Sequence, residues 1–244
     1  LSFFGPEGEH IPFEREYRKL YLDQNYSNGF LDWNYYPLSD HTNSQTANKL
    51  RELYSNLALN YKLTSYLTAS LSGQYQQQQV LAEGLDDSDS YIARRTVNQY
   101  MQVDENTGAV KYNVPKGGIL RTNNGTGSSY TLRGQLNLNK SWTEHRVIGV
   151  IGAEMRERLY KENSQTAYGY TEDPLLTVPV DYVNTYPINP TNINMNVVGA
   201  PSFLKQVNRF VSQYANLSYI WHDKYGVSGS FRNGRQTCRI GTSV

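Results

Sequence analysis

The sequence YLTASLSGQYQ at residues 66–76 alternates apolar and polar side chains over its whole length. Successive side chains of a β-strand point to opposite faces, so a strand here has one apolar face and one polar face. One parity carries Leu67, Ala69, Leu71, Gly73 and Tyr75, and the other carries Thr68, Ser70, Ser72, Gln74 and Gln76. Residues 130–139 repeat the pattern with the sequence YTLRGQLNLN. This period of two predicts β-strands in both segments.

Six segments of about ten residues carry such strand patterns, and they form three pairs. The pairs are 51–61 with 66–76, 130–140 with 146–155, and 207–221 with 225–232. Short turns at 62–65, 141–145 and 222–224 join the partners, whereas long polar stretches at 77–129 and 166–206 separate the pairs. Tilted strands of about ten residues cross a bilayer, and outer-membrane β-barrels combine short periplasmic turns with long extracellular loops.

We therefore expect an all-β fold: an antiparallel transmembrane β-barrel segment of about six strands, incomplete because single-chain barrels need about eight. A soluble β-sandwich shows the same alternation, but three features favour the barrel. The apolar parities contain glycines, which cannot fill a core: Gly73, Gly134, Gly149 and Gly229. Charged side chains occupy the polar parities, and aromatic side chains lie near strand ends, as in interfacial girdles. Leu71 and Leu136 should face lipid, with Gln74 and Arg133 facing the lumen.

Composition narrows the class of protein further. The chain has 244 residues, a net charge of +1 and 38% hydrophobic residues. It has no run of about 18 apolar residues, so no transmembrane helix is expected. A near-neutral charge without a basic stripe gives no indication of nucleic-acid binding. The single Cys238 excludes an internal disulfide framework.

Catalytic and metal-binding motifs are absent from the sequence. It has no Gly-x-Ser-x-Gly elbow, no HExxH motif and no phosphate-binding loop, so we do not expect an enzyme. Asp86, Asp87 and Asp89 lack the glycine and distal glutamate of an EF-hand loop, so a solvated acidic loop is favoured over a calcium site. Glu154 and Arg156 lie two apart on one strand face, where we expect a structural role. We expect neither a metal nor a cofactor.

The polar segments suggest how the chain is organised. Residues 1–48 form an expected extracellular loop region with a short helix around 13–22, and a second short helix is expected around 90–100. Residues 49–234 contain the barrel strands and their loops, and residues 235–244 form an atypical or truncated tail. Long loops inside one domain are usually functional or disordered.

Several stretches resemble the barrel region of SusC/RagA-type transporters, which are TonB-linked outer-membrane proteins of Bacteroidetes. They are GPEG at 5–8, PFEREY at 12–17, LDWNYYPL at 31–38, SYIAR at 90–94, VPKGGIL at 114–120 and GAEMRE at 152–157, with residues 209–212, 223–225 and 230–233. The resemblance runs from about Gly5 to Asn233, and it rests on the order and spacing of these pieces together.

The resemblance implies import of oligosaccharides or peptides across the outer membrane. A SusD-like surface lipoprotein would close the barrel over the ligand, and TonB with ExbB and ExbD would act on a plug. Carbohydrates stack on aromatic rings, so the expected ligand contacts are loop aromatics: Trp33, Tyr35, Tyr36, Tyr91, Tyr168 and Tyr170. These rings could instead pack loop against loop.

Members of this family also have a signal peptide, a carboxypeptidase-like domain, a TonB-contacting box, a plug and many more strands, and we recognise none of these here. After Asn233 the sequence departs from the family pattern, so we expect a fragment. The alternative function is that of a soluble β-sandwich that binds glycans.

Overall fold

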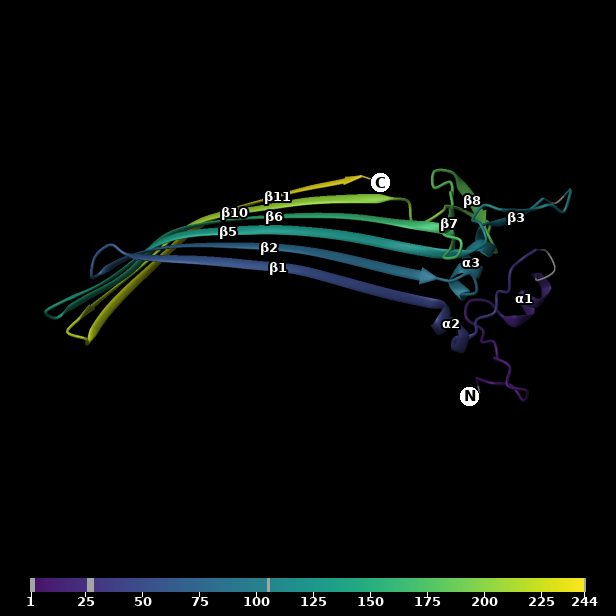
Figure 1. The fold of residues 1–244 in the computed structure, drawn as a ribbon, viewed down its shortest axis with the longest axis horizontal. Coiled ribbons are helices and arrows are strands. Elements are labelled where there is room, and N and C mark those ends of the chain that lie inside the picture. The colour runs from purple at the N-terminus through teal and green to yellow at the C-terminus, as the bar shows by residue number, and fades with distance from the viewer. Residues whose placement is uncertain (1–2, 26–28, 105, 244) are drawn as a thin grey trace.

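The computed structural model describes residues 3–25, 29–104 and 106–243. Its main feature is a long antiparallel sheet in which consecutive long strands are neighbours (Figure 1). These strands are β1 (Ser44–Lys62), β2 (Leu67–Asp86), β5 (Gly118–Trp142), β6 (His145–Thr171), β10 (Ser202–Trp221) and β11 (Tyr225–Ser243). Within the described residues β1 and β11 each pair with one neighbour only, so the sheet does not close. The prediction of an incomplete, antiparallel, all-β barrel segment is confirmed at the level of the fold.

The three predicted hairpins are present, and their turns lie together at one end of the sheet. Residues 63–66, 143–144 and 222–224 connect β1 to β2, β5 to β6 and β10 to β11. The last two turns contact each other, because the His222 backbone N–H donates to the Glu144 carbonyl oxygen over 2.7 Å. The His222 ring also contacts the Glu144 carboxylate. Both contacts join the β5–β6 hairpin to the β10–β11 hairpin.

The predicted strand length of about ten residues is wrong, because the long strands contain 19 to 27 residues. The extra length lies at the end opposite the turns, where the strands continue into segments that we predicted to be loops. Residues 77–86 belong to β2 and residues 118–129 to β5. Both parities of these residues mix polar side chains with apolar ones such as Val80, Leu81 and Leu120, so they lack the regular alternation that identified the strands. The loops that remain between the strands are 87–117 and 172–201.

Register partners on neighbouring strands share a face, and this divides the sheet into two unlike surfaces. One face, which we call the polar face, carries a continuous row formed by Ser72, Arg133, Glu154 and Ser212. The opposite face, which we call the apolar face, carries rows such as Ala69, Leu136, Ile151 and Ala215. The predicted separation is confirmed: Leu71 and Leu136 lie on one face, and Gln74 and Arg133 lie on the other.

The apolar face has a band of exposed hydrophobic side chains near the hairpin turns. Leu57, Ile151 and Leu217 are 64%, 59% and 57% exposed. The band ends at the Tyr75–Tyr130 row on one side and at the Lys140–Val147–Tyr219 row on the other. These rows are ten residues apart along β5, which is roughly 33 Å of strand, or about 25 Å across a membrane at a tilt of about 40°.

The loops gather at the end opposite the turns and contain the helices and the short strands (Figure 1). The helices are α1 (Lys19–Asn25), α2 (Pro37–Asn43) and α3 (Tyr91–Tyr100). The short strands are β3 (Met101–Val103), β4 (Val110–Tyr112), β7 (Leu176–Val178), β8 (Thr185–Ile188) and β9 (Ile193–Asn196). No helix among the described residues is long and apolar enough to span a membrane.

The helix predicted around 90–100 is confirmed as α3, and its N-terminus is capped by Ser90. The Ser90 Oγ accepts a hydrogen bond from the Ala93 backbone N–H over 3.1 Å, which satisfies one of the free donors of the first turn. The helix predicted around 13–22 is wrong over its first half, because α1 begins only at Lys19. Phe13 instead forms an isolated β-bridge with Tyr35, and this pairing replaces the helical backbone bonds.

Two of the predicted boundaries can be placed on the strands. β1 begins at Ser44, inside the segment that we assigned to the first loop region, and β11 extends through residues 235–243 of the atypical tail. The apolar face does not continue through that tail, because the tail residues on this face are Arg235, Thr237, Arg239 and Gly241.

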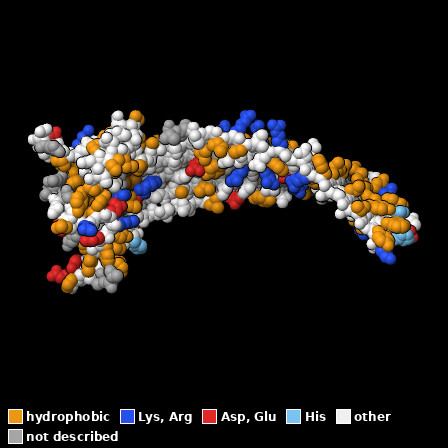
Figure 2. All heavy atoms as spheres, turned by 180° about the vertical axis from the view of Figure 1, so that it is seen from behind, with side chains coloured by type: hydrophobic (Ala, Val, Ile, Leu, Met, Phe, Trp, Pro, Cys, Tyr) orange, Lys and Arg blue, Asp and Glu red, His pale blue; other side chains and the backbone are white. Residues whose placement is uncertain are grey.

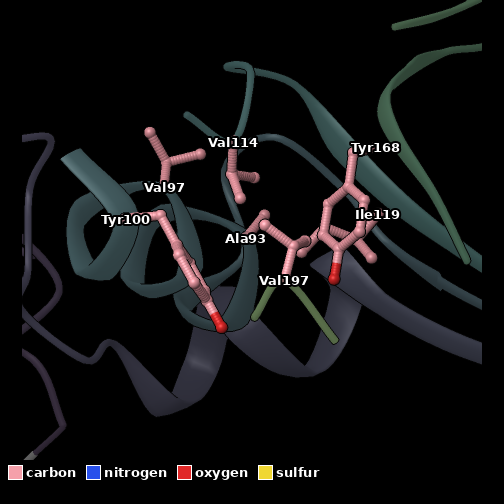
Figure 3. Close-up of a cluster of buried hydrophobic side chains, with 7 residues drawn as sticks. All are labelled: Ala93, Val97, Tyr100, Val114, Ile119, Tyr168 and Val197. Atoms are coloured by element: carbon pink, nitrogen blue, oxygen red, sulfur yellow. The ribbon is translucent and has the colours of Figure 1, made fainter. Parts of the chain in front are cut away.

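The largest buried cluster lies where the loops meet the ends of β5 and β6, and not between two sheets (Figure 3). It contains side chains from α3, both long loops and the strand ends: Ala93, Val97, Tyr100, Val114, Ile119, Tyr168 and Val197. A second, smaller cluster consists of Leu22, Trp33 and Tyr91. Hydrophobic burial is the main driving force for packing such segments. The packed loops at this end of the sheet, which we call the loop end, therefore form an ordered cap on it.

Candidate functional site

The most distinctive constellation on the polar face is a carboxylate between two guanidinium groups. Arg133 donates to Glu154 Oε2 from Nε at 3.1 Å and from Nη2 at 2.6 Å. Arg156 Nη2 donates to the other oxygen, Oε1, at 3.3 Å. The Glu154 side chain is 3% exposed, whereas the two arginine side chains are about half exposed, at 48% and 56%. The carboxylate is therefore held from both sides, and the cations remain open to solvent.

The same face has more positive than negative charge around this cluster. Arg158 follows Arg156 on β6, and Arg232 lies on β11 with its Nη2 3.4 Å from Ser212 Oγ and its guanidinium carbon 5.8 Å from the Phe210 ring centroid. Glu154 is the one carboxylate among these groups. Figure 2 shows Lys and Arg side chains gathered over the middle of the strands and hydrophobic ones toward the hairpin ends. This part of the polar face can attract anionic or strongly polar groups.

A ladder of amide side chains continues the polar face along β2. Gln74, Gln76 and Gln78 line a surface hollow together with Thr131, Arg156 and Arg158. Gln76 contacts the Glu52 carboxylate on β1. Amide groups both donate and accept hydrogen bonds, so this surface suits hydroxyl-rich or peptide ligands as well as water.

Three of the predicted ligand-contact aromatics are buried inside the loop end. Trp33, Tyr91 and Tyr168 are each at most 3% exposed. Trp33 packs edge-on against Tyr17 and stacks on Phe30, with both centroid distances 5.3 Å. The Tyr168 hydroxyl donates to the Val198 carbonyl oxygen over 2.8 Å. In this arrangement the three rings join loop segments to one another.

The other three predicted aromatics are half-buried. The Arg15 guanidinium carbon lies 4.6 Å from the ring centroid of Tyr35, and Arg94 lies 5.8 Å from that of Tyr36. Tyr170 pairs with Gly118 at the bulged end of β5 and β6. Tyr35 and Tyr36 lie close together in the loop end, and both rings interact with cations.

Helix α3 connects the separate loops, a role that the sequence did not indicate. The fully buried Asn98 side chain accepts from the Leu31 N–H at 2.8 Å and donates to the Leu31 carbonyl oxygen at 2.9 Å. Arg94 donates to the carbonyl oxygens of Asp32 and Asn34 at 2.7 and 3.2 Å. Amide and guanidinium groups that bind backbone atoms 60 or more residues away hold the loop end in one arrangement.

The same helix also binds the third loop segment. The Tyr100 hydroxyl donates to the Asn196 carbonyl oxygen over 2.7 Å. Asn189 donates from its side chain to the carbonyl oxygens of Asn98 and Met101 at 3.0 and 2.6 Å. α3 therefore joins the first and third loop regions, and Ser90 caps its N-terminus.

Burial raises the pKa of Tyr91 to about 12, and the nearby Glu16 carboxylate acts in the same direction. The Tyr91 backbone N–H also donates to the buried Asp40 Oδ1 over 2.5 Å. A neutral phenol at this position is thus part of the packed loop end.

The acidic residues at 86–89 take part in internal contacts. Asp86 accepts from the Ser44 hydroxyl over 2.7 Å and contacts Arg121. Asp87 Oδ1 accepts from the Ser88 hydroxyl at 2.9 Å and the Asp89 N–H at 3.3 Å. Across the part of the chain that the structure describes, no group of three or more His, Cys, Asp and Glu side chains could hold a metal ion.

Comparison with known proteins identifies a relationship at the level of the fold. No protein-family model matches the sequence, and no curated protein matches it. Among solved structures, the chain is similar to a chain of the RagAB peptide transporter, with a TM-score of 0.58 and 11% identity. The match covers 82% of this chain and 20% of that one. The chain therefore shares its β-rich fold with part of that transporter chain, and it spans about a fifth of the length of that chain.

Proposed function

We propose that this chain forms part of the barrel wall of a TonB-dependent outer-membrane importer of oligosaccharides or peptides. The observation that carries the proposal is the two-faced sheet, in which an exposed apolar band about 25 Å high backs onto a charged polar face. Such a band matches the hydrocarbon thickness that outer-membrane barrels cross. The likeness to the RagAB peptide transporter supports the same reading.

The apolar face would contact lipid. Exposed patches as extensive as the one around Leu57, Ile151 and Leu217 are unusual on proteins surrounded by water. Inside a bilayer every backbone N–H and C=O needs a partner, and continuous antiparallel pairing from β1 to β11 supplies those partners. In this proposal the chain is part of a longer protein, which we call the parent. The open edges of β1 and β11 would pair with further strands of that parent.

The polar face would line the lumen through which the substrate moves. The Arg133–Glu154–Arg156 cluster and the glutamines of β2 offer donors and acceptors without a deep apolar site. Weak, distributed polar contacts let a large ligand bind and leave, as conduction requires. No catalytic group or cofactor is needed for this role.

The loop end would be the extracellular surface. A SusD-like lipoprotein would dock there, and Tyr35, Tyr36 and Tyr170 are the predicted aromatics best exposed for contact with substrate or lid. Trp33, Tyr91 and Tyr168 would support them from beneath. TonB, with ExbB and ExbD, would act through a plug region outside this chain.

The alternative of a soluble glycan-binding sandwich has little support. A sandwich buries the apolar face of one sheet against another of similar size. The other sheets in the described residues have two strands each, and they lie at the loop end.

Cysteine labelling of the full-length parent in outer-membrane fragments tests the proposal, with Cys238 replaced. Leu71→Cys and Ser72→Cys are adjacent positions on opposite faces, and Leu136→Cys with Thr131→Cys forms a second pair. A water-soluble thiol reagent should label positions 72 and 131, and a lipid-soluble reagent should label positions 71 and 136. Equal labelling of neighbours by the water-soluble reagent, or recovery of the parent in the soluble fraction, would contradict a membrane wall.

A further inference from the structure

A belt of positive charge lies on the apolar face just beyond the Tyr75–Tyr130 row. Moving away from the hairpin turns, the next three rows of this face contain Arg239, then Arg51, Lys161 and Lys205, then Lys49. We call these five residues the basic belt. All five side chains are exposed, and none has an ion-pair partner within the described residues.

The carboxylates nearest to the belt on the apolar face are Glu157, one row before it, and Glu83, one row beyond Lys49. Glu157 lies in the Tyr130 row and forms an ion pair with Arg209, its register partner. The charges of Glu157 and Arg209 compensate each other, so Glu83 alone stands beside the five basic side chains in the described strands, and the belt keeps an excess of positive charge. The rows that hold the belt contain no Asp or Glu in the described strands, so the belt is predominantly positive.

The centre of the belt is a pair of like charges placed directly opposite each other. Lys161 on β6 and Lys205 on β10 are register partners, and directly opposed side chains have Cβ atoms about 5 Å apart. Like charges in this position destabilise a sheet. The two lysines border a surface hollow that is also lined by Asn124, Thr126, Asn163 and Phe203. Glu162 lines it as well, and its carboxylate accepts hydrogen bonds from Asn123 and Tyr160 on the polar face. An anion in this hollow would offset the repulsion and accept hydrogen bonds from its polar lining.

The height of the belt indicates which anion is available there. Its first two rows lie two and four residues beyond the Tyr130 row, which is about 5 and 10 Å along the membrane normal at barrel tilt. Aromatic girdles mark the headgroup level of a bilayer, so the belt faces the headgroup layer. Phe203 and Leu81 on the same face offer apolar contact beside the charges.

We propose that the basic belt, centred on Lys161 and Lys205, binds phosphate groups of anionic lipid headgroups. The inference rests on the proposed membrane placement of the apolar band. Bound lipid would anchor the barrel at a defined height, and the interaction would weaken as salt concentration rises. Each basic residue near an anionic membrane surface contributes about 1 kcal/mol, so losing two weakens binding about thirtyfold.

Lipid retention by the purified full-length parent tests the proposal. The parent, in neutral detergent micelles, is given phosphatidylglycerol or diacylglycerol, which has similar chains and no phosphate. The bound lipid is measured after gel filtration. The variant Lys161→Gln/Lys205→Gln should bind phosphatidylglycerol about thirtyfold more weakly than wild type, while Lys161→Arg/Lys205→Arg should keep binding. The control Lys111→Gln/Lys116→Gln removes two charges from the loop end and should bind like wild type.

Three outcomes would overturn the inference: unchanged binding by the double glutamine variant, equal binding of diacylglycerol by wild type, or displacement of the lipid by inorganic phosphate at equimolar concentration. The last result would identify a site for free anions. If Lys161→Gln/Lys205→Gln does not fold, the single variant Arg239→Gln should still weaken binding about fivefold, and unchanged binding by it would also count against the belt. Failure here with normal cysteine labelling at positions 71 and 72 would leave the barrel-wall proposal intact.

Discussion

Glu154 is the residue on which the electrostatics of the polar face depend. It is the buried partner of two half-exposed arginines on the same sheet face. Its own solvation is lost, so its stability there depends on the hydrogen bonds from Arg133 and Arg156. Without it, two guanidinium groups would face each other across neighbouring strands.

Replacing Glu154 with Gln should lower the free energy of unfolding of the parent by about 1–3 kcal/mol, because charge-assisted hydrogen bonds in a buried position are lost. The half-exposed arginines retain solvent, so the larger cost of a fully buried pair is not expected. Glu157→Gln removes the partly exposed pair on the opposite face and should cost about 1 kcal/mol or less. Unfolding of the variants in detergent measures both losses of stability, and the double variant Glu154→Gln/Arg133→Gln serves as a rescue variant. Equal losses of unfolding free energy in the two single variants would contradict the burial argument.

Tyr91 should make the loop end sensitive to alkaline pH. Its pKa is raised from 10.0 to about 12 in the folded state, so the neutral phenol favours folding. That contribution is complete below pH 10 and is lost as the pH rises through about 12. Protease cleavage of the loops across this range should increase less steeply in Tyr91→Phe, which cannot ionise, than in wild type. Identical pH profiles would show that Tyr91 does not control opening of the loop end.

The sequence predicted which side of a strand a residue lies on, but not how the loops pack. Arg133 and Glu154 could be assigned to one face because alternation in a strand is local. The burial of Trp33 and Tyr168 depends on partners far along the chain, such as the Val198 carbonyl that binds the Tyr168 hydroxyl. A polar, aromatic loop sequence is compatible with both exposed and packed rings.

At the scale of the elements, the strands have two zones with different chemistry. From the hairpin turns to the Tyr75–Tyr130 row, one face is apolar and alternation is clear. Beyond that row both faces mix polar side chains with apolar ones such as Leu53 and Val80, and the backbone pairing of β2 with β5 nevertheless continues to Asp86. Periodicity identified only the first zone, because strands without regular alternation resemble loops in composition.

In the zone nearest the hairpin turns, an added charge should have different effects on the apolar face and on the polar face. Leu71 lies near the middle of the apolar band, so Leu71→Arg should destabilise the barrel by about 2–4 kcal/mol, as charges at a bilayer midplane do. Gln74→Arg adds the same charge to the polar face and should have a much smaller effect. Heat-modifiable migration of the membrane-assembled parent reports folding. Comparable loss of the folded form in both variants would contradict the assignment of faces.

At the scale of the whole molecule, short turns at one end and a packed loop end at the other give the sheet a direction (Figure 1). The turn end carries aromatic side chains and tight hairpins, and the loop end carries α3 and its contacts. Sequence spacing predicted this asymmetry, because hairpin turns and long connections alternate along the chain. The order within the loop end could not be predicted, since it depends on side-chain contacts between segments such as Asn98 with Leu31.

The chain by itself should associate in aqueous buffer, for two separable reasons. Its apolar face exposes large side chains such as Leu57 and Ile151, and β1 and β11 each have one unpaired edge among the described strands. Exposed apolar patches and open edges both promote association. Mild detergent covers the apolar face but leaves the edges unpaired, so particles measured by light scattering should shrink in detergent without reaching monomer size. A monodisperse monomer in detergent-free buffer would contradict both the lipid-facing band and the need for further strands.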